Sequence, residues 1–159
     1  MWIKEISASE TFELRHSVLR ANFPRSSVHY EQDLLKGAFH LGVFEGESLI
    51  SVGSFYESSR PPEHIIRLLD IPLDETLLEL PFQLRGMATH PDFRGLGAGS
   101  LLIHTGKFIL ETKGASLLWF NARVKAFPFY HRLGFSEIGE LFNSYTVPHK
   151  VMFKRFGKE

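Results

Sequence analysis

The 159-residue sequence contains no cysteine, which excludes a disulfide framework, a thiolate nucleophile and a metal site with cysteine ligands. Eighteen Lys and Arg residues balance 18 Asp and Glu residues, so no global excess of positive charge favours nucleic acid or an anionic membrane surface. No apolar run could span a bilayer, and residues 1–5 lack the apolar stretch of a signal peptide. We therefore expect a cytoplasmic protein with no nucleic-acid or membrane partner.

The residues that are present predict one globular domain over residues 1–159. Hydrophobic residues make up 43% of the chain, and 15 phenylalanines favour strands and an aromatic interior. Ser9 is the expected N-cap of the first helix, and Gly114 is the expected C-cap of the helix that follows the glycine-rich loop. Apolar patterning predicts strands over 2–7, 39–44, 49–56, 82–89, 116–121, 135–140 and 147–156, helices over 9–23, 101–110 and 125–132, and helical turns near 30–36 and 74–78.

A glycine-rich loop between a predicted strand and a predicted helix is the most informative stretch. Residues 89–100 read T-H-P-D-F-R-G-L-G-A-G-S, and this order of strand, loop and helix suits an anion, because backbone N–H groups are free at a helix start. A Walker loop needs a lysine after the last glycine, but Ser100 follows Gly99. A Rossmann fingerprint needs a different glycine spacing. From the residues alone, an anion site and an ordinary turn both remain open.

Two motifs in the second half of the chain resemble the GCN5-related N-acetyltransferase (GNAT) superfamily. Segment 94–99, R-G-L-G-A-G, is similar to the family's R/Q-x-x-G-x-G/A signature, and segment 84–93 resembles its fourth strand and loop. Segment 126–135, A-F-P-F-Y-H-R-L-G-F, is similar to the family's A-x-x-F/L-Y-x-x-x-G-F motif. Segments 14–16 and 148–152 loosely resemble its ElaA-like branch. The resemblance implies an α/β (α+β) acyl-CoA N-acyltransferase fold, with a mixed, mostly antiparallel central sheet flanked by helices.

The resemblance also implies acetyl-CoA as the acetyl donor and gives candidate cofactor contacts. The diphosphate would bind the glycine loop, and the pantetheine arm would pair with the strand before it, as an added strand does. The family's arm-contacting asparagine corresponds in position to Arg123, while Asn121 lies two residues earlier, so either could contact the arm; Asn121 could also be a strand-end cap. The other implied cofactor contacts are Met87, Ala88, Thr89, Arg94, Gly95, Leu96, Gly97, Ala98, Gly99 and Ser100.

Acetyl transfer needs a proton donor for the thiolate and a neutral amine. Tyr130 corresponds to the family's tyrosine and is the candidate general acid, because a phenol with a pKa near 10 stays protonated at neutral pH. Without the resemblance, a core aromatic would be the simpler role for Tyr130. Gln83 stands where histone-acetylating members carry a glutamate, and an amide could orient a water but cannot act as a base. Glu79, His90, His149 or a water relay stay open for that role.

Arg85 is the most interesting substrate candidate, because on an alternating strand it shares a face with Gln83 and Met87. It could grip a substrate carboxylate, or pair internally with an acid such as Asp33 or Glu57. The internal pair is favoured, since structural ion pairs outnumber substrate clamps. The further substrate candidates are Arg15, Gln83 and His149.

These observations predict an N-acetyltransferase that acts on a primary amine of a small molecule through a tyrosine general acid. The alternative is a non-catalytic acyl-CoA-binding sensor or interaction module, which Gln83 keeps open. The eight histidines show no paired metal spacing, so we expect no metal. The aromatic hairpin over 142–156 could pair across a homodimer.

Overall fold

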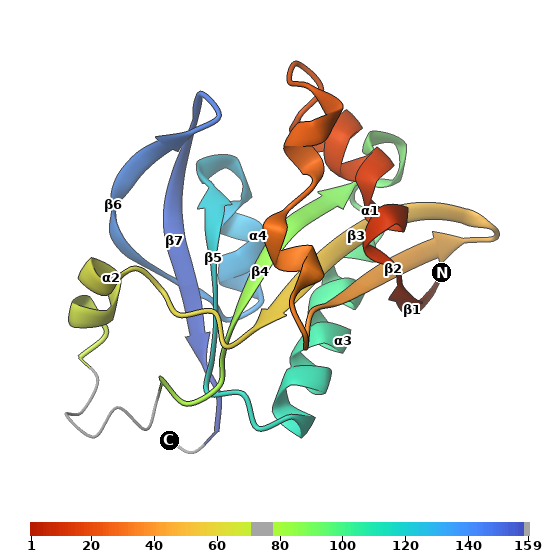
Figure 1. Cartoon of the computed structure of the whole chain (residues 1–159). Helices are drawn as coiled ribbons and strands as arrows, with labels where there is room; N and C mark the ends of the chain where they lie inside the picture. Colours follow the sequence, from red (N-terminus) through yellow and green to blue (C-terminus); the bar gives the residue numbers. More distant parts are fainter. Residues whose placement is uncertain (71–77, 158–159) are drawn as a thin grey trace. The chain divides into compact units, whose positions relative to one another are not determined.

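The computed structural model of the chain describes residues 1–70 and 78–157. Within these residues, seven strands form a mixed sheet in the order β1-β2-β3-β4-β5-β7-β6, and helices flank it (Figure 1). This confirms the expected fold class. The contacts divide the chain into two compact units, residues 1–57 with 84–110 and residues 58–83 with 111–159.

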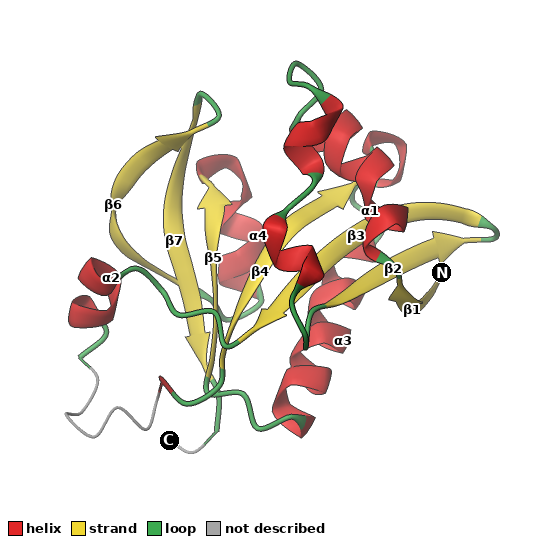
Figure 2. Ribbon diagram, viewed as in Figure 1, coloured by secondary structure: helices red, strands yellow, loops and turns green. Residues whose placement is uncertain are grey.

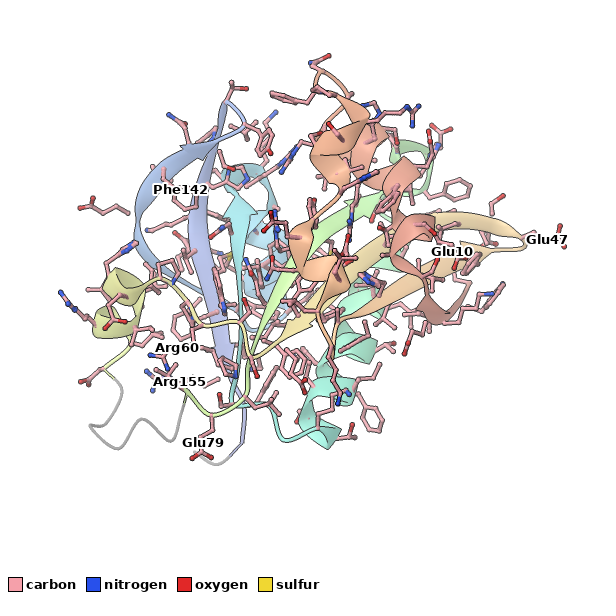
Figure 3. All side chains as sticks on the ribbon, in the orientation of Figure 1. Glu10, Glu47, Arg60, Glu79, Phe142 and Arg155 are labelled. Atoms are coloured by element: carbon pink, nitrogen blue, oxygen red, sulfur yellow. The ribbon has the colours of Figure 1, made fainter. Side chains whose placement is uncertain are left out.

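The first unit begins with an antiparallel meander. Strand β1 (Trp2–Ile6) pairs with β2 (Phe39–Glu45), which pairs with β3 (Ser48–Glu57). The predicted strands are confirmed here, and Figure 3 shows Glu47 at the outer tip of the β2–β3 turn. Trp2 stacks on Phe44 with ring centres 4.4 Å apart, so the first strand is held by side chains as well as by its ladder.

The first helix is shorter than its apolar stripe predicted. Helix α1 (Ala8–Leu14) has Ser7 as its N-cap, in a capping box with Glu10, and the expected cap at Ser9 was therefore wrong. A π-helical turn, Arg15–Leu19, follows α1, so regular helix ends before Phe23. Short 3₁₀ turns, Arg25–Val28 and Glu31–Leu34, complete this connection, and the second agrees with the turn expected near 30–36.

Helix α3 (Ala98–Thr112) buries a different face from the one expected. Helical periodicity puts Leu101, Leu102, Thr105, Phe108 and Ile109 on one face and predicts that this face is buried, but Phe108 is 69% exposed. Gly106 explains the difference, because a Cβ there would lie only 2.4 Å from the Phe55 ring. The absence of that Cβ lets the helix approach β3 closely. The buried face consists of Ala98, Leu102, Ile103, Gly106 and Leu110.

The second unit contains the start of β4 (Pro81–Thr89) with β5, β6 and β7, shown as arrows in Figure 2. β4 pairs in parallel with β5, from Pro81 opposite Leu117 to Gln83 opposite Trp119. β5 pairs antiparallel with β7, and β7 with β6. The ranges are β5 (Leu117–Arg123), β6 (Ser136–Ser144) and β7 (Val147–Arg155).

Two helices accompany these strands. Helix α4 (Phe127–Arg132) agrees with its prediction, and Pro128 lies in its first turn, where the missing N–H costs nothing. Helix α2 (Glu63–Leu68) was not predicted, although its Ile65 and Ile66 are buried against Trp119 and Val151. The helical turn expected near 74–78 lies, apart from Leu78, outside the described residues.

Candidate functional site

Strand β4 is irregular at Gly86, and this irregularity opens the strand to solvent. Residues 81–84 are buried, residues 85–87 are all partly exposed, and Ala88 is buried again, so strict alternation fails. Gly86 has φ +63°, and a Cβ at this position would lie 2.9 Å from Arg15 Nε and 3.1 Å from the Tyr30 ring. Glycine is therefore required both by the backbone conformation and by the side chains packed behind it.

The loop after β4 leads directly into the start of α3. Gly95 and Gly97 have φ +79° and +91°, values that favour glycine. The Leu101 N–H donates to the Gly97 carbonyl at 3.0 Å, and the N–H groups of residues 98–100 precede this first helical bond. The first turn of α3 contains no acidic residue that could occupy these donors. The helix start thus has the features that favour binding of an anion.

The entrance of the loop is open and positively charged. Arg94 is exposed, and within residues 1–70 and 78–157 no carboxylate lies in ion-pair distance of it. A Cβ added to Gly95 would meet no atom within 4 Å, so the space beside this residue is empty of protein. An anionic group could approach the backbone here without displacing any side chain.

The C-terminal end of β4 is fixed to the neighbouring strand β3. Thr89 Oγ1 and Ser51 Oγ lie 2.8 Å apart in a hydrogen bond, and the His90 N–H donates to the Ile50 carbonyl at 2.7 Å. His90 Nδ1 in turn accepts from the Asp92 N–H at 3.1 Å. Residues 87–89, expected to pair with the pantetheine arm, therefore end in a well-anchored segment that delivers the chain to the glycine loop.

A fully buried arginine lies behind β4. Arg15 is 0% exposed and donates from both terminal nitrogens to Asp33, at 2.8 and 3.1 Å. Further donations reach the Val28 carbonyl at 2.8 Å, Ser54 Oγ at 2.8 Å and the Tyr56 hydroxyl at 3.2 Å. Arg15 was expected near the substrate. Because the side chain has no solvent exposure, its observed contacts are those of a residue that positions other groups, and contact with an acceptor stays a prediction.

The charges of this cluster are mutually stabilised. Burial alone would lower the pKa of Arg15, but the hydrogen bond to Asp33 and nearby charges outweigh it and raise that pKa. Burial opposes ionisation of Asp33 as well, yet hydrogen bonds from Arg15 and Tyr56 hold its pKa below the ordinary value. Burial lowers the pKa of His40, whose Nδ1 lies 2.6 Å from Ser54 Oγ. The cluster therefore contains an ion pair between Arg15 and Asp33 beside the neutral imidazole of His40.

The buried position of Arg15 could have been anticipated from its helical spacing. Thr11, Leu14 and Val18 lie at helical offsets from one another, and Arg15 falls four residues after Thr11 on the same stripe. The buried acceptors Asp33, Ser54 and Tyr56 are 18, 39 and 41 residues away in sequence. No local pattern indicates such partners, so the cluster itself was missed.

Arg85 has neutral partners, contrary to the internal ion pair that was favoured. Its Nη1 donates to the Gln32 side-chain carbonyl at 2.8 Å, and its guanidinium carbon lies 3.8 Å from the centre of the Tyr30 ring. The Arg15 guanidinium carbon lies 4.1 Å from the centre of that ring. Asp33, one of the two acids proposed for Arg85, is engaged by Arg15 instead.

The ring of Tyr130, in the second unit, packs against other aromatic rings, while its hydroxyl makes no hydrogen bond with the described residues. The ring centre lies 4.4 Å from that of Phe120, 5.0 Å from that of Phe129 and 6.1 Å from that of Phe135. Burial raises the pKa of this phenol, which keeps it protonated. Across the described residues the hydroxyl makes no hydrogen bond, so its proton is not committed to a structural partner.

The side chain of Gln83 is buried and hydrogen-bonded within the fold. It is 8% exposed, and its Oε1 accepts from Ser59 Oγ at 3.0 Å, while the Ser59 carbonyl accepts from the Trp119 indole at 2.8 Å. This glutamine ties the segment after β3 to the parallel β4–β5 pair. Glu79, labelled in Figure 3, is exposed on the loop before β4.

The remaining predicted residues lie along β5 and β7. Arg123 ends β5 directly opposite His149, and Asn121 lies opposite Val151 with an exposed side chain. His149 Nδ1 lies 2.7 Å from the Val147 carbonyl, and its ring stacks on Phe142 at 5.9 Å. Arg123 and His149 are therefore neighbours in the sheet, which the sequence separation of 26 positions did not indicate.

The described residues contain neither a metal-binding cluster nor a membrane-spanning helix. No three His, Asp or Glu side chains come together there in a way that could hold a metal ion. No helix among them is both long and apolar enough to cross a membrane.

Comparison with known proteins identifies the family. A family model described as an acetyltransferase (GNAT) domain matches residues 65–137. The uncharacterized N-acetyltransferase YitI of Bacillus subtilis is 36% identical over 154 residues, covering 96% of this chain and 94% of that protein.

Solved structures share the fold at low sequence identity. Escherichia coli ElaA superposes with a TM-score of 0.69 at 16% identity, covering 97% of this chain and 99% of its own. An aminoglycoside 6'-N-acetyltransferase complexed with coenzyme A gives a TM-score of 0.71 at 12% identity, covering 100% of this chain and 99% of its own. These structures share the fold, while the 36% identity to YitI and the matching family model show that the chain belongs to the GNAT family of acetyl-CoA-dependent N-acetyltransferases.

Proposed function

We propose that the protein transfers the acetyl group of acetyl-CoA to a primary amine of a small molecule. The observation that carries this proposal is the start of α3. Backbone N–H groups that precede the first helical bond, two glycines with positive φ, and Arg94, which has no ion pair within the described residues, lie together there. The first helical turn contains no acidic residue. Such a site suits the diphosphate of coenzyme A. The pantetheine arm would then extend along Met87, Ala88 and Thr89.

The proposed reaction is direct attack. The neutral amine attacks the thioester carbonyl carbon, a C–N bond forms, and the C–S bond breaks as the tetrahedral oxyanion collapses. A backbone N–H near residues 87–89 would stabilise that oxyanion. The departing thiolate takes the proton of Tyr130, the proton lost by the amine passes to solvent through a water relay, and solvent returns one proton to the Tyr130 phenolate. The Tyr130 hydroxyl supports the role of general acid, because within the described residues no hydrogen bond engages it, and burial keeps it protonated by raising its pKa.

A water relay is preferred over the side-chain bases considered above. Gln83 cannot accept a proton, and its carbonyl oxygen is engaged by Ser59. Glu79 is exposed on a loop. The Nδ1 of His90 accepts a backbone N–H, so its neutral ring carries the proton on Nε2. His149 donates from Nδ1 to the Val147 carbonyl, which leaves the lone pair of its neutral ring on Nε2, and it stays the alternative base. Asn121 and Arg123 stay candidates for contact with the cofactor arm.

Charge reversal at Arg94 tests the cofactor site. We expect Arg94→Glu to weaken acetyl-CoA binding by about 10- to 100-fold in calorimetry, because it places a negative charge beside the diphosphate. Arg67→Glu, the same change at an exposed arginine of α2, serves as control and should leave the affinity unchanged. Unchanged affinity in Arg94→Glu would contradict the proposed diphosphate site.

Release of the CoA thiol across a panel of small primary amines tests the activity. Turnover with any amine supports the proposal. Tight acetyl-CoA binding without turnover across the panel would favour a sensor.

The homodimer also stays a prediction. Leu141, Phe142 and Tyr145 are 63%, 37% and 42% exposed on the β6–β7 hairpin, and sedimentation of the protein at several concentrations would test self-association.

A further inference from the structure

We propose that Arg85 binds a carboxylate of the acceptor, so that the substrates are small amines that also carry a carboxylate, as amino acids do. This inference rests on the proposed acetyl transfer and specifies its acceptor. All the residues that carry it, on β3, on β4 and in the connection between α1 and β2, belong to the first unit.

The first argument is the unbalanced charge of Arg85. Its two contacts are the Gln32 amide, at 2.8 Å, and the Tyr30 ring, at 3.8 Å, and both are neutral. Among residues 1–70 and 78–157, no carboxylate lies within ion-pair distance of this guanidinium. A partly buried arginine is stabilised by an anionic partner, and the protein supplies none in this part of the chain.

The second argument is that the nearby acid, Asp33, is paired with Arg15 and not with Arg85. Asp33 accepts from both terminal nitrogens of Arg15 and from the Tyr56 hydroxyl at 2.5 Å, so three of its lone-pair positions are occupied. Arg15 is fully buried, whereas Arg85 is partly exposed. The two arginines near Tyr30 are thus distinct: one is neutralised inside the protein, and the other keeps its charge at the surface of β4.

The third argument is preorganisation. Tyr30 is 7% exposed and lies 4.1 Å from the Arg15 guanidinium carbon, so its ring is held by the buried cluster. Stacking on this ring and the bond to Gln32 fix the plane of the Arg85 guanidinium. Only one of its five N–H donors is used by Gln32, which leaves an edge for two parallel bonds to a carboxylate. A fixed, planar donor pair suits a planar carboxylate better than a flexible ammonium would.

The fourth argument is position along β4. Arg85 directly precedes Gly86, where the strand opens, and lies two residues before Met87, where the proposed contact with the pantetheine arm begins. Two strand residues span about 7 Å. A carboxylate held by Arg85 would therefore place an amine one or two carbon atoms away close to the acetyl end of the arm.

Matched acceptor pairs test this inference in the whole protein. CoA-thiol release is measured with the common amino acids, with their carboxamides and with O-phosphoethanolamine, for the wild type and for Arg85→Gln. We expect the wild type to prefer acids, and Arg85→Gln to lower kcat/KM for acids by about 30- to 100-fold while changing that for amides less than about 3-fold. Arg25→Gln, at an exposed arginine paired with Glu13, is the matched control.

Several results would overturn the carboxylate site. These are equal use of acids and amides by the wild type, preference for the phosphate-bearing amine, or an equal loss for acids and amides in Arg85→Gln. Arg85→Lys keeps the charge without the planar fork and should give an intermediate loss for acids. This variant keeps the test available if Arg85→Gln does not fold.

Product binding separates this inference from the proposed activity. N-acetyl amino acids and their amides are titrated by calorimetry into CoA-saturated wild type and Arg85→Gln. Absence of turnover with every amine would reject the proposed function, while weaker binding of N-acetyl amino acids to Arg85→Gln would still support the carboxylate site. Identical binding of acids and amides to the wild type would reject the site even if turnover were found.

Discussion

At the scale of single residues, the two tyrosines with raised pKa values have opposite hydrogen-bonding states. The Tyr56 hydroxyl donates to Asp33 and accepts from Arg15, while the Tyr130 hydroxyl has no hydrogen bond in the described residues. Burial raises the pKa of both. The Tyr56 phenol contributes to structure, and that of Tyr130 is available for proton transfer.

Replacement of each tyrosine by phenylalanine should separate these roles. Tyr130→Phe removes a hydroxyl that makes no hydrogen bond with the described residues, so we expect little change in Tm and about a 100-fold loss of kcat. Tyr56→Phe leaves Asp33 with one donor fewer and should lower the free energy of unfolding by about 1 to 3 kcal/mol. Steady-state kinetics and urea denaturation measure the two effects. Full kcat in Tyr130→Phe would exclude the phenol as the general acid.

The residues themselves allowed part of this site to be predicted. The glycine positions and Tyr130 lie in contiguous motifs, which a sequence displays directly. The roles of Arg15, Gln83 and Arg85 depend on partners from other elements: Asp33, Ser59 and Gln32 respectively. Polar contacts of this kind follow from tertiary packing, so spacing along the chain could not distinguish the buried arginine from the partly exposed one.

At the scale of elements, the loop before α3 requires glycine at position 95 for two reasons: its positive φ and the space that the proposed diphosphate would occupy. Gly95 and Gly114 both have φ +79°, and a Cβ at either would meet no protein atom within 4 Å. Alanine should therefore cost each site a similar backbone strain, about 1 to 2 kcal/mol. Only at Gly95 would the methyl group also enter the proposed diphosphate space.

The two alanine variants form a matched pair for this loop. We expect Gly95→Ala to weaken acetyl-CoA binding by about 10-fold or more, whereas Gly114→Ala leaves the affinity unchanged despite a similar loss of stability. Calorimetry measures the affinity and thermal denaturation measures the stability. Equal affinities in the two variants would place the diphosphate away from Gly95.

Strand β4 offers a second matched pair. Gly86 and Gly46 have φ +63° and +60°, but a Cβ at Gly86 would press on Arg15 and Tyr30, while one at Gly46 would meet nothing within 4 Å. Gly46→Ala should cost about 1 to 2 kcal/mol of unfolding free energy from strain alone. Gly86→Ala should cost at least about 1 kcal/mol more, because the buried Arg15 cannot move without losing hydrogen bonds. Urea denaturation measures both losses of unfolding free energy. Equal losses would show that Arg15 and Tyr30 can move to accommodate the added methyl group at little cost.

Elements with strong local signals were predicted well, and those defined by packing were not. The glycine loop, the β2–β3 turn and α4 carry local markers that agree with the structure. Helix α2 is only six residues long and contains the buried Ile65 and Ile66, so it is too short to show a helical periodicity in the sequence. The face of α3 was misassigned because Gly106, an apparently weak helix position, is the point of closest approach to Phe55.

At the scale of the whole molecule, the buried cluster makes folding stability depend on pH. His40 faces Ser54, Asp33, Tyr56 and Arg15, with Glu5 also acting on its charge, and burial holds its pKa below the ordinary 6.5. The folded protein therefore keeps the imidazole neutral at a pH where the unfolded chain takes up a proton. The unfolded state binds more protons, so stability rises with pH through this range.

The sign of this linkage determines the expected profile. The contribution of His40 should be fully present above about pH 6.5 and be lost as the pH falls toward its folded-state pKa. Asp33 adds a second loss at lower pH, because its pKa is also depressed and protonation would break the pair with Arg15. Urea denaturation at pH 8, 7, 6 and 5 should show a free energy of unfolding that is level between pH 8 and 7 and decreases from pH 7 to 5, before Asp33 titrates.

Replacement of the imidazole tests which group is responsible. His40→Asn keeps a hydrogen-bonding group near Ser54 but cannot titrate, so at pH 8 we expect a loss of about 1 kcal/mol, and between pH 7 and 5 a flatter profile than that of the wild type. His104→Asn, at an exposed position of α3, is the control and should keep the wild-type slope. If His40→Asn retained the full slope, the pH dependence would have to arise from another group, and the cluster behind β4 would be insensitive to the charge of its histidine.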